Sequence, residues 1–260
     1  MQDYIVSLTT IPSRHGAIEA TLQSLRAQTV PPREIAIYVP KSYRRAEFRD
    51  APMPRVPSWC RVVQVDEDLG PATKVLYAIG NAGALPVLYC DDDRLYPPDM
   101  ADTYLAMAAA RPGACVAGRA VPVRKYLMQY GFEKDAAYRL RRILSFGRYR
   151  PKEIRPSDRL DIAAGFAGVL VQPGAFDDRV FDIPEHFWLV DDIWLSGHMA
   201  LAGTAIVSPG RNLARSGRNE ANEADALNAY VYQDRRREEL DRMCIRHFQA
   251  EHGLWSEARA

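Results

Sequence analysis

The stretch VLYCDDDRLYPPDM, residues 87–100, places three consecutive carboxylates at the end of an apolar run. The unbroken apolar residues before Asp91 predict a strand that is buried on both faces, and the two prolines that follow predict a turn opening a helix. Three like charges at one strand end repel each other, so the stretch requires a compensating positive charge. The plain alternative is a solvated strand end whose aspartates serve a turn or a helix cap.

Asp91 and Asp93 stand two residues apart, so their side chains point the same way on an extended segment. Two carboxylates in that arrangement suit a hard divalent cation such as Mg²⁺ or Mn²⁺, whose remaining positions are filled by substrate phosphate oxygens. We therefore predict a metal site at Asp91 and Asp93. A cation held there would stabilise the negative charge that develops on a departing diphosphate.

Apolar runs and helical stripes alternate on both sides of this stretch. Strands are predicted over 4–10, 34–40, 61–66, 86–90, 115–123 and 204–209, and helices are predicted to begin near residues 18, 71, 98 and 191. This alternation predicts an α/β domain over residues 1–210, with a mostly parallel sheet flanked by helices. Such sheets bind ligands beyond the carboxyl ends of their strands, near a topological switch point.

Two segments do not follow this alternation of strands and helices. Residues 119–160 hold twelve Lys and Arg against four Asp and Glu, with aromatic residues between them. They predict either a solvated insertion or a basic lobe that binds an acceptor, a lipid phosphate or a membrane surface. Residues 211–260 predict a C-terminal helical extension beginning near Asp225, and its RRREE run, residues 235–239, is expected to be a solvated face.

The bulk composition narrows the class of protein. The 260 residues carry a formal net charge of +1, which is not the strongly basic footprint of a dedicated nucleic-acid binder. The four cysteines form no C-x-x-C pair, so buried free thiols are expected. Neither a secretory signal nor a membrane-spanning run is visible in the sequence. We expect a cytoplasmic protein, with peripheral contact at the inner face of the membrane left open.

A second acidic pair, Asp191-Asp192, stands at a predicted helix start between Trp188 and Trp194. Helix capping explains one of these aspartates. The other, in a partly apolar cleft, is a candidate general base that accepts a proton from an attacking hydroxyl. The indoles would then stack on a sugar face, or they are core residues.

Four motifs carry a resemblance to a known family. In chain order they are YIVSLTTIPSR (4–14), DLGPATK (68–74), VLYCDDD (87–93) and LVDDIWLSG (189–197). Their pattern resembles the nucleotide-sugar glycosyltransferases of the GT-A fold, with the D-x-D after an apolar strand as the most diagnostic element. The AAGFAGVLV segment (163–171) also resembles the exostosin-like catalytic domain, and the size resembles bacterial polysaccharide and lipopolysaccharide transferases.

The resemblance implies metal-dependent transfer of a sugar from a nucleotide-diphosphate donor to a hydroxyl of a glycan or glycolipid, in surface polysaccharide biosynthesis. It implies Asp191 or Asp192 as the catalytic carboxylate. It implies that Asp91 and Asp93 hold Mn²⁺ or Mg²⁺, with His198 as a further ligand or, more simply, a helix-surface histidine. The implied donor pocket comprises Thr9, Thr10, Arg14, Lys74, Asp91 and Asp92, and the implied acceptor side comprises Gly165, Trp188 and Trp194.

Other classes of protein fit less well. A haloacid-dehalogenase-like phosphatase carries its D-x-D near the N-terminus, whereas this one lies in mid-chain. The Gly-rich basic opening of nucleotidyltransferases, the G-x-G-x-x-G of dinucleotide binding and the G-x-S-x-G of serine hydrolases are all absent. No Q-x-x-R-W follows the acidic pair, which argues against a processive synthase. A non-catalytic carbohydrate-binding protein on a transferase fold stays an alternative.

Overall fold

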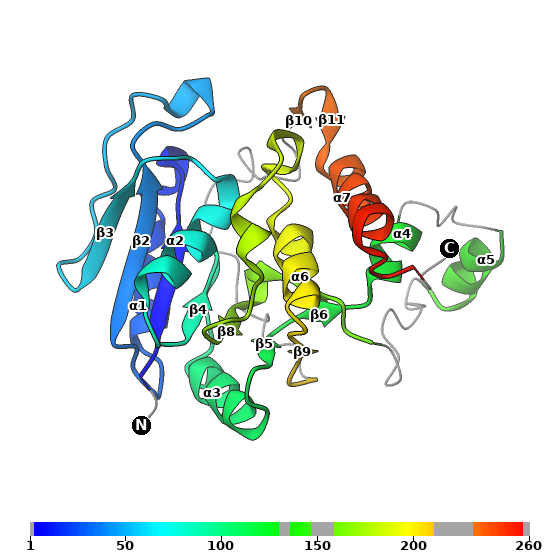
Figure 1. The fold of residues 1–260 in the computed structure, drawn as a ribbon, viewed down its shortest axis with the longest axis horizontal. Helices are drawn as coiled ribbons and strands as arrows, with labels where there is room; N and C mark the ends of the chain where they lie inside the picture. Colours follow the sequence, from blue (N-terminus) through cyan, green and yellow to red (C-terminus); the bar gives the residue numbers. More distant parts are fainter. Residues whose placement is uncertain (1–2, 130–135, 147–158, 211–230, 257–260) are drawn as a thin grey trace.

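The protein, seen in a computed structural model that describes residues 3–129, 136–146, 159–210 and 231–256, is built on a seven-stranded sheet (Figure 1). The strand order is β3-β2-β1-β4-β8-β5-β9, and every neighbouring pair is parallel except the two pairs that β8 makes. The predicted α/β class with a mostly parallel sheet is therefore confirmed. The strands are β1 (Ile5–Thr9), β2 (Glu34–Pro40), β3 (Cys60–Val65), β4 (Val87–Tyr89), β5 (Cys115–Ala117), β8 (Val169–Val171) and β9 (Ile206–Val207).

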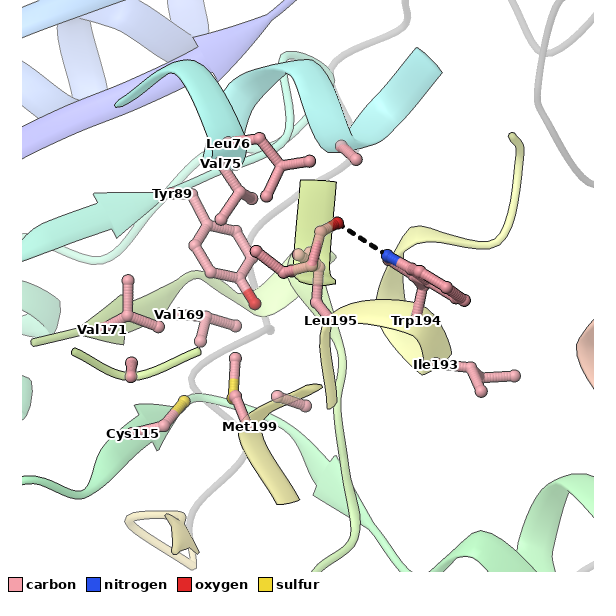
Figure 2. Close-up of a cluster of buried hydrophobic side chains, with 14 of the residues drawn as sticks. Val75, Leu76, Tyr89, Cys115, Val169, Val171, Ile193, Trp194, Leu195 and Met199 are labelled. Atoms are coloured by element: carbon pink, nitrogen blue, oxygen red, sulfur yellow. Dashed lines mark hydrogen bonds between the residues drawn. The ribbon is translucent and has the colours of Figure 1, made fainter. Parts of the chain in front are cut away.

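Helices cover both faces of the sheet. Alternate residues of β4 show the two sides: Leu88 packs in one buried cluster, and Tyr89 packs in the other. The Leu88 cluster contains side chains of α1 (Ile18–Arg26) and α3 (Met100–Ala110). The Tyr89 cluster, part of which Figure 2 shows, contains side chains of α2 (Thr73–Asn81), α6 (Asp191–Leu201) and α7 (Arg237–His252).

The order of the strands reverses at β1. Strand β1 lies between β2 and β4, with Ser7 aligned to Ala36 on one side and to Tyr89 on the other. The chain thus leaves β1 towards one edge of the sheet, and β4 returns on the opposite side of β1. The carboxyl ends of β1 and β4 therefore form a topological switch point, where α/β sheets bind their ligands. Thr10 and Asp91 lie just beyond these two ends.

The single strand predicted over 115–123 is wrong in detail. The chain leaves the main sheet after β5, and β6 (Ala120–Val121) pairs with β7 (Ile162–Ala163) in a separate two-stranded sheet. The break falls at Gly118, where a Cβ would lie 2.0 Å from the Tyr104 hydroxyl. After β6 the chain forms α4 (Val123–Gln129), and α5 (Ala136–Leu144) lies at the outer edge of the molecule beyond it (Figure 1).

The C-terminal helix begins later than the predicted start near Asp225. Residues 211–230 lie outside the described residues, and residues 231–236 form a hairpin of β10 (Val231–Tyr232) and β11 (Arg235–Arg236). Gln233 and Asp234 both have positive φ, 49° and 59°, as a two-residue hairpin turn requires. The helix α7 begins only at Arg237.

The hairpin leads α7 into the core rather than into solvent. Leu240, Cys244, Ile245 and Phe248 are buried in the same cluster as α6, beside which α7 lies (Figure 1). The four cysteines are buried free thiols, as expected. Within the described ranges, none of the helices is long and apolar enough to cross a membrane.

Candidate functional site at the carboxyl ends of β1 and β4

Asp92 joins the loops that follow β1 and β4. One carboxylate oxygen accepts a hydrogen bond from the Thr10 hydroxyl at 2.6 Å, and the other accepts one from Arg14 Nη1 at 2.7 Å. Its backbone carbonyl accepts a third from the Thr21 hydroxyl at 2.9 Å. The side chain is 4% exposed, so Asp92 pins the two loops together instead of presenting a carboxylate to a ligand.

Thr9, the last residue of β1, is partly exposed, and its hydroxyl donates to the Tyr38 carbonyl at 2.8 Å. The three residues at the end of β1 that were predicted to bind the donor therefore have different surroundings. Thr10 and Arg14 lie against Asp92, whereas Thr9 is hydrogen-bonded towards β2. Arg14 also reaches Asp93 at 3.7 Å.

Lys74 connects the two acidic motifs. Its buried ammonium lies 2.7 Å from Oδ1 of Asp91 and 3.1 Å from Oδ2 of Asp191, residues that are far apart in the sequence. Burial alone would lower the pKa of Lys74, but the surrounding carboxylates, Asp91 foremost, outweigh burial and raise it. Lys74 therefore stays charged and holds the start of α6 against the end of β4.

Arg237, the first residue of α7, is the second cation that contacts Asp191. Its Nη2 lies 3.0 Å from Oδ1 of Asp191, the oxygen that Lys74 does not bind. Burial tends to raise the pKa of Asp191, but Lys74 and Arg237 outweigh burial and lower it. Our expectation that the RRREE run forms a solvated face is wrong for Arg237, although the adjacent Arg236 is exposed.

The pKa of Asp192 is shifted in the opposite direction from that of Asp191. It lies in the first turn of α6, is partly exposed, and has no ion pair among the contacts of the described residues. Oδ1 accepts a hydrogen bond from the Gly165 N–H at 2.9 Å. Burial, and then the charge of Asp191, raise the pKa of Asp192 to about 7. Neither aspartate caps the helix, because the N-cap is Val190 and no side-chain cap bond is formed.

Gly165 shows how closely the two motifs converge. A Cβ built on this glycine would lie 3.2 Å from Oδ1 of Asp192, 3.4 Å from Nζ of Lys74 and 3.7 Å from Oδ1 of Asp91. Gly165 lies just before β8, the antiparallel strand next to β4, so its backbone reaches the same edge of the sheet. The absence of a side chain at Gly165 lets these three charged groups approach one another.

Asp93 fits a metal ligand better than its neighbours do. Its ion pairs to Arg14 and Arg94 are long, 3.7 and 3.5 Å, and its carboxylate is 24% exposed. Burial, and then the negative charge of Asp91, raise the pKa of Asp93, so a cation between the two carboxylates would relieve their repulsion. No cluster of three His, Cys, Asp or Glu side chains within the described residues is arranged to hold a metal. Mg²⁺ held by one or two carboxylates plus substrate phosphates needs no such cluster.

The two indoles predicted to contact the acceptor, Trp188 and Trp194, are both buried. Trp194 is 4% exposed in the core, and its indole N–H donates to the Val180 carbonyl at 2.9 Å (Figure 2). Trp188 is 5% exposed, and its indole N–H donates to the Asp68 carbonyl at 3.0 Å. With both rings packed and both N–H groups satisfied, each indole has a structural role here.

His198 lies two turns along α6 from Asp191. Its Nδ1 is 3.0 Å from Oδ2 of Asp177, and its ring packs against Trp194 and Phe248. Burial outweighs Asp177 and lowers the pKa of His198. At about 1.5 Å of helix per residue, this histidine is about 10 Å along the axis from the Asp191 position, and its contacts are with residues other than Asp91 and Asp93.

Comparisons with known proteins add little to this geometry. No family model matches the chain, and no curated protein sequence matches it. Solved structures that share its general arrangement include S. aureus TarS 1-349 in complex with UDP, at 14% identity and a TM-score of 0.47, covering 80% of this chain and 58% of that one. Against a longer structure of TarS, with the same identity and TM-score, the chain covers 35% of the length.

A further similar structure is the 2-C-methyl-D-erythritol 4-phosphate cytidylyltransferase from Thermus thermophilus. The identity is 15%, the TM-score is 0.44, and the match covers 83% of this chain and 92% of that one. The match to the two TarS structures, by contrast, covers less than two thirds of their length. At TM-scores below 0.5, these likenesses assign neither an activity nor a ligand to this chain.

Proposed function

We propose that this protein is a glycosyltransferase that moves a sugar from a nucleotide-diphosphate donor to a hydroxyl of a glycan or glycolipid. The observation that carries the proposal is the convergence of Asp91, Lys74, Asp191 and Asp192 at the switch point between β1 and β4. Two acidic motifs that are far apart in the sequence meet there. They offer one carboxylate with a raised pKa, which suits a general base that deprotonates an acceptor hydroxyl.

Asp192 is the general base in this proposal. With a pKa of about 7 it exchanges protons near neutral pH, and it is partly exposed at the site. It accepts the proton of the acceptor hydroxyl while that oxygen bonds to the anomeric carbon. The bond from the anomeric carbon to the diphosphate breaks, and the diphosphate leaves with the electron pair. Direct displacement of this kind inverts the anomeric centre.

Asp191 and Lys74 position this base. The two cations that bind Asp191 keep it ionised, so its negative charge raises the proton affinity of Asp192. The Gly165 N–H fixes one oxygen of Asp192, which leaves the other oxygen for the acceptor hydroxyl. The order of motifs, which resembles that of the GT-A transferases, supports assigning the donor to the β1 and β4 side.

Asp93, with Asp91, would hold Mn²⁺ or Mg²⁺ in this proposal. The cation, when bound, would offset the negative charge that develops on the leaving diphosphate. The chain's own contribution is the pair of carboxylates and the Arg14 guanidinium beside them. Asp92 acts indirectly, since its hydrogen bonds hold Thr10 and Arg14 at the edge of this site.

A donor-hydrolysis screen tests the proposal. Purified protein is incubated with Mn²⁺ and each common nucleotide sugar in turn, and released nucleoside diphosphate is measured. We expect slow release from one donor, abolished in Asp192→Asn. Thermal unfolding with a panel of nucleoside diphosphates, with and without metal, gives an independent reading because a ligand that binds the native state raises the apparent stability.

The two alternative classes give different results in the same assays. A non-catalytic carbohydrate-binding protein would release no nucleoside diphosphate from any donor and would be stabilised by glycans rather than by nucleotides. A phosphatase would release inorganic phosphate from phosphate monoesters and would leave nucleotide sugars intact. Either pattern would overturn the proposal.

A further inference from the structure

The most exposed large apolar side chains of the described residues gather in one short segment. Leu140, Ile143, Leu144 and Phe146 are 57%, 72%, 71% and 93% exposed. The three other large apolar side chains that are exposed, Met53, Leu95 and Phe181, lie singly elsewhere in the chain and are less exposed than any of the four. Soluble proteins rarely leave contiguous apolar groups in water unless they bind a partner there.

Three of these four side chains share one face of a helix. Leu140, Ile143 and Leu144 follow the spacing of three and four residues that brings side chains together on an α-helix. Phe146 comes just after the end of α5, which is Ala136–Leu144. We call Leu140, Ile143, Leu144 and Phe146 the α5 apolar face. It points away from the packed core, since none of its members belongs to either buried cluster.

The charged residues of α5 itself are all basic. Arg141 and Arg142 of the same helix are exposed, and the sequence from residue 136 to residue 152 contains no Asp or Glu. In Figure 1, α5 lies at the outer edge of the molecule, away from the seven-stranded sheet. A basic helix with exposed Leu, Ile and Phe on its other face is typical of helices that lie in the plane of a membrane interface.

We propose that α5 docks on the surface of a bilayer containing anionic phospholipid. The apolar face enters the boundary between headgroups and acyl chains, and the arginines contact the lipid phosphates. Because α5 has only nine residues and carries arginines beside its apolar face, we expect attachment to depend on anionic headgroups. This inference goes beyond the proposed transferase function and does not rest on it.

Vesicle flotation tests the proposal with the full chain. The vesicles are phosphatidylcholine alone, or phosphatidylcholine mixed with phosphatidylglycerol. We expect binding to the mixed vesicles only, weakened by salt. Ile143→Ser combined with Phe146→Ser should weaken binding by about tenfold or more, because burial of one large apolar side chain is worth about a factor of ten. Arg141→Gln combined with Arg142→Gln should also weaken it.

The matched control is Met53→Ser combined with Phe181→Ser, which removes two exposed apolar side chains elsewhere and should leave vesicle binding unchanged. Circular dichroism confirms that each variant is folded. No binding of the parent protein to the mixed vesicles would overturn the proposal. So would self-association in solution that Ile143→Ser with Phe146→Ser abolishes, since a second copy would then be the occupant. Donor hydrolysis in solution should be unaffected by either α5 variant.

Discussion

Arg237 and Asp191, 46 residues apart in the sequence, are joined by an ion pair of 3.0 Å between Nη2 and Oδ1. With Lys74 on the other oxygen, Asp191 has a cation on each side, whereas Asp192 receives only a backbone N–H among the contacts of the described residues. The pKa of Asp191 is lowered and the pKa of Asp192 is raised to about 7. Adjacent residues of the same type thus have opposite roles in our proposal, one as a fixed charge and one as a proton acceptor.

Replacement of Asp192 tests that division. Asp192→Asn should lower kcat by about 10²–10⁴-fold, the usual contribution of a general base, while the Kd for nucleoside diphosphate changes little. Asp191→Asn should instead disturb the fold, because Lys74 and Arg237 each lose a buried ionised partner. Steady-state kinetics, nucleotide binding and urea unfolding separate the two effects. Equal loss of stability in both variants would contradict the assignment.

The raised pKa of Asp192 also has a consequence for stability. An aspartate whose pKa is about 7 when folded and about 3.9 when unfolded binds protons more tightly in the folded state. Its ionisation therefore decreases the free energy of unfolding as the pH rises from about 4 to about 7. Asp192→Asn removes this loss, so the variant should gain stability relative to the parent protein across that interval. Urea titrations at several pH values measure the difference.

Arg237 should act through the pKa of Asp192. Its positive charge lowers that pKa, so Arg237→Gln should raise it and shift the rising limb of kcat/KM to higher pH. Arg237→Lys, which keeps a charge, should shift it less. The neighbouring Arg236 is exposed, and Arg236→Gln is the matched control, with no shift expected. A uniform loss of activity at all pH values in Arg237→Gln would indicate a purely structural role.

Six of the seven strands of the sheet overlap predicted strands, because buried parallel strands carry unbroken apolar runs. The antiparallel strand β8 was not among the predictions. The run before Asp91 became β4, and the alternation with helices indicated the correct sheet class. The break after β5 could not be predicted in this way, because it follows from a change of partner: β5 pairs with β8 and β9, whereas β6 pairs with β7. A contact between two elements leaves no periodic signal in either of them.

The site shows the same contrast between local patterns, which the sequence reveals, and contacts between elements, which it does not. The acidic motifs are local patterns, so Asp91, Asp93 and Asp192 could be selected from the sequence. Arg237 could not, because three consecutive arginines, residues 235–237, look alike in the sequence. Only the hairpin turn before α7 and the packing of α7 on α6 turn Arg237 inward. The same packing places Trp194 in the core, although its position beside the acidic pair suggested a binding role.

Asp93 should determine the metal dependence of turnover. Asp93→Ala should abolish the Mn²⁺-dependent part of donor hydrolysis while leaving the unfolding midpoint close to that of the parent protein, because Asp93 makes only long ion pairs among the described residues. Chelation of the metal from the parent protein should reduce turnover to the level of the variant. Turnover that is insensitive to both the chelator and the substitution would remove Asp93 from the site.

The contact between α6 and α7 should control the site from a distance. A Cβ on Gly197 would lie 2.2 Å from a ring carbon of Phe248, so in Gly197→Ala either the buried ring or α7 itself must shift. We expect the shift to reach Arg237 at the start of α7. Overpacking of this kind costs about 1–3 kcal/mol, and we expect donor hydrolysis to fall with the stability. Phe248→Leu in the same chain frees space for the methyl group and should restore part of both losses. Gly80, with open space around it in α2, is the control, since Gly80→Ala should be neutral or stabilising by up to about 1 kcal/mol.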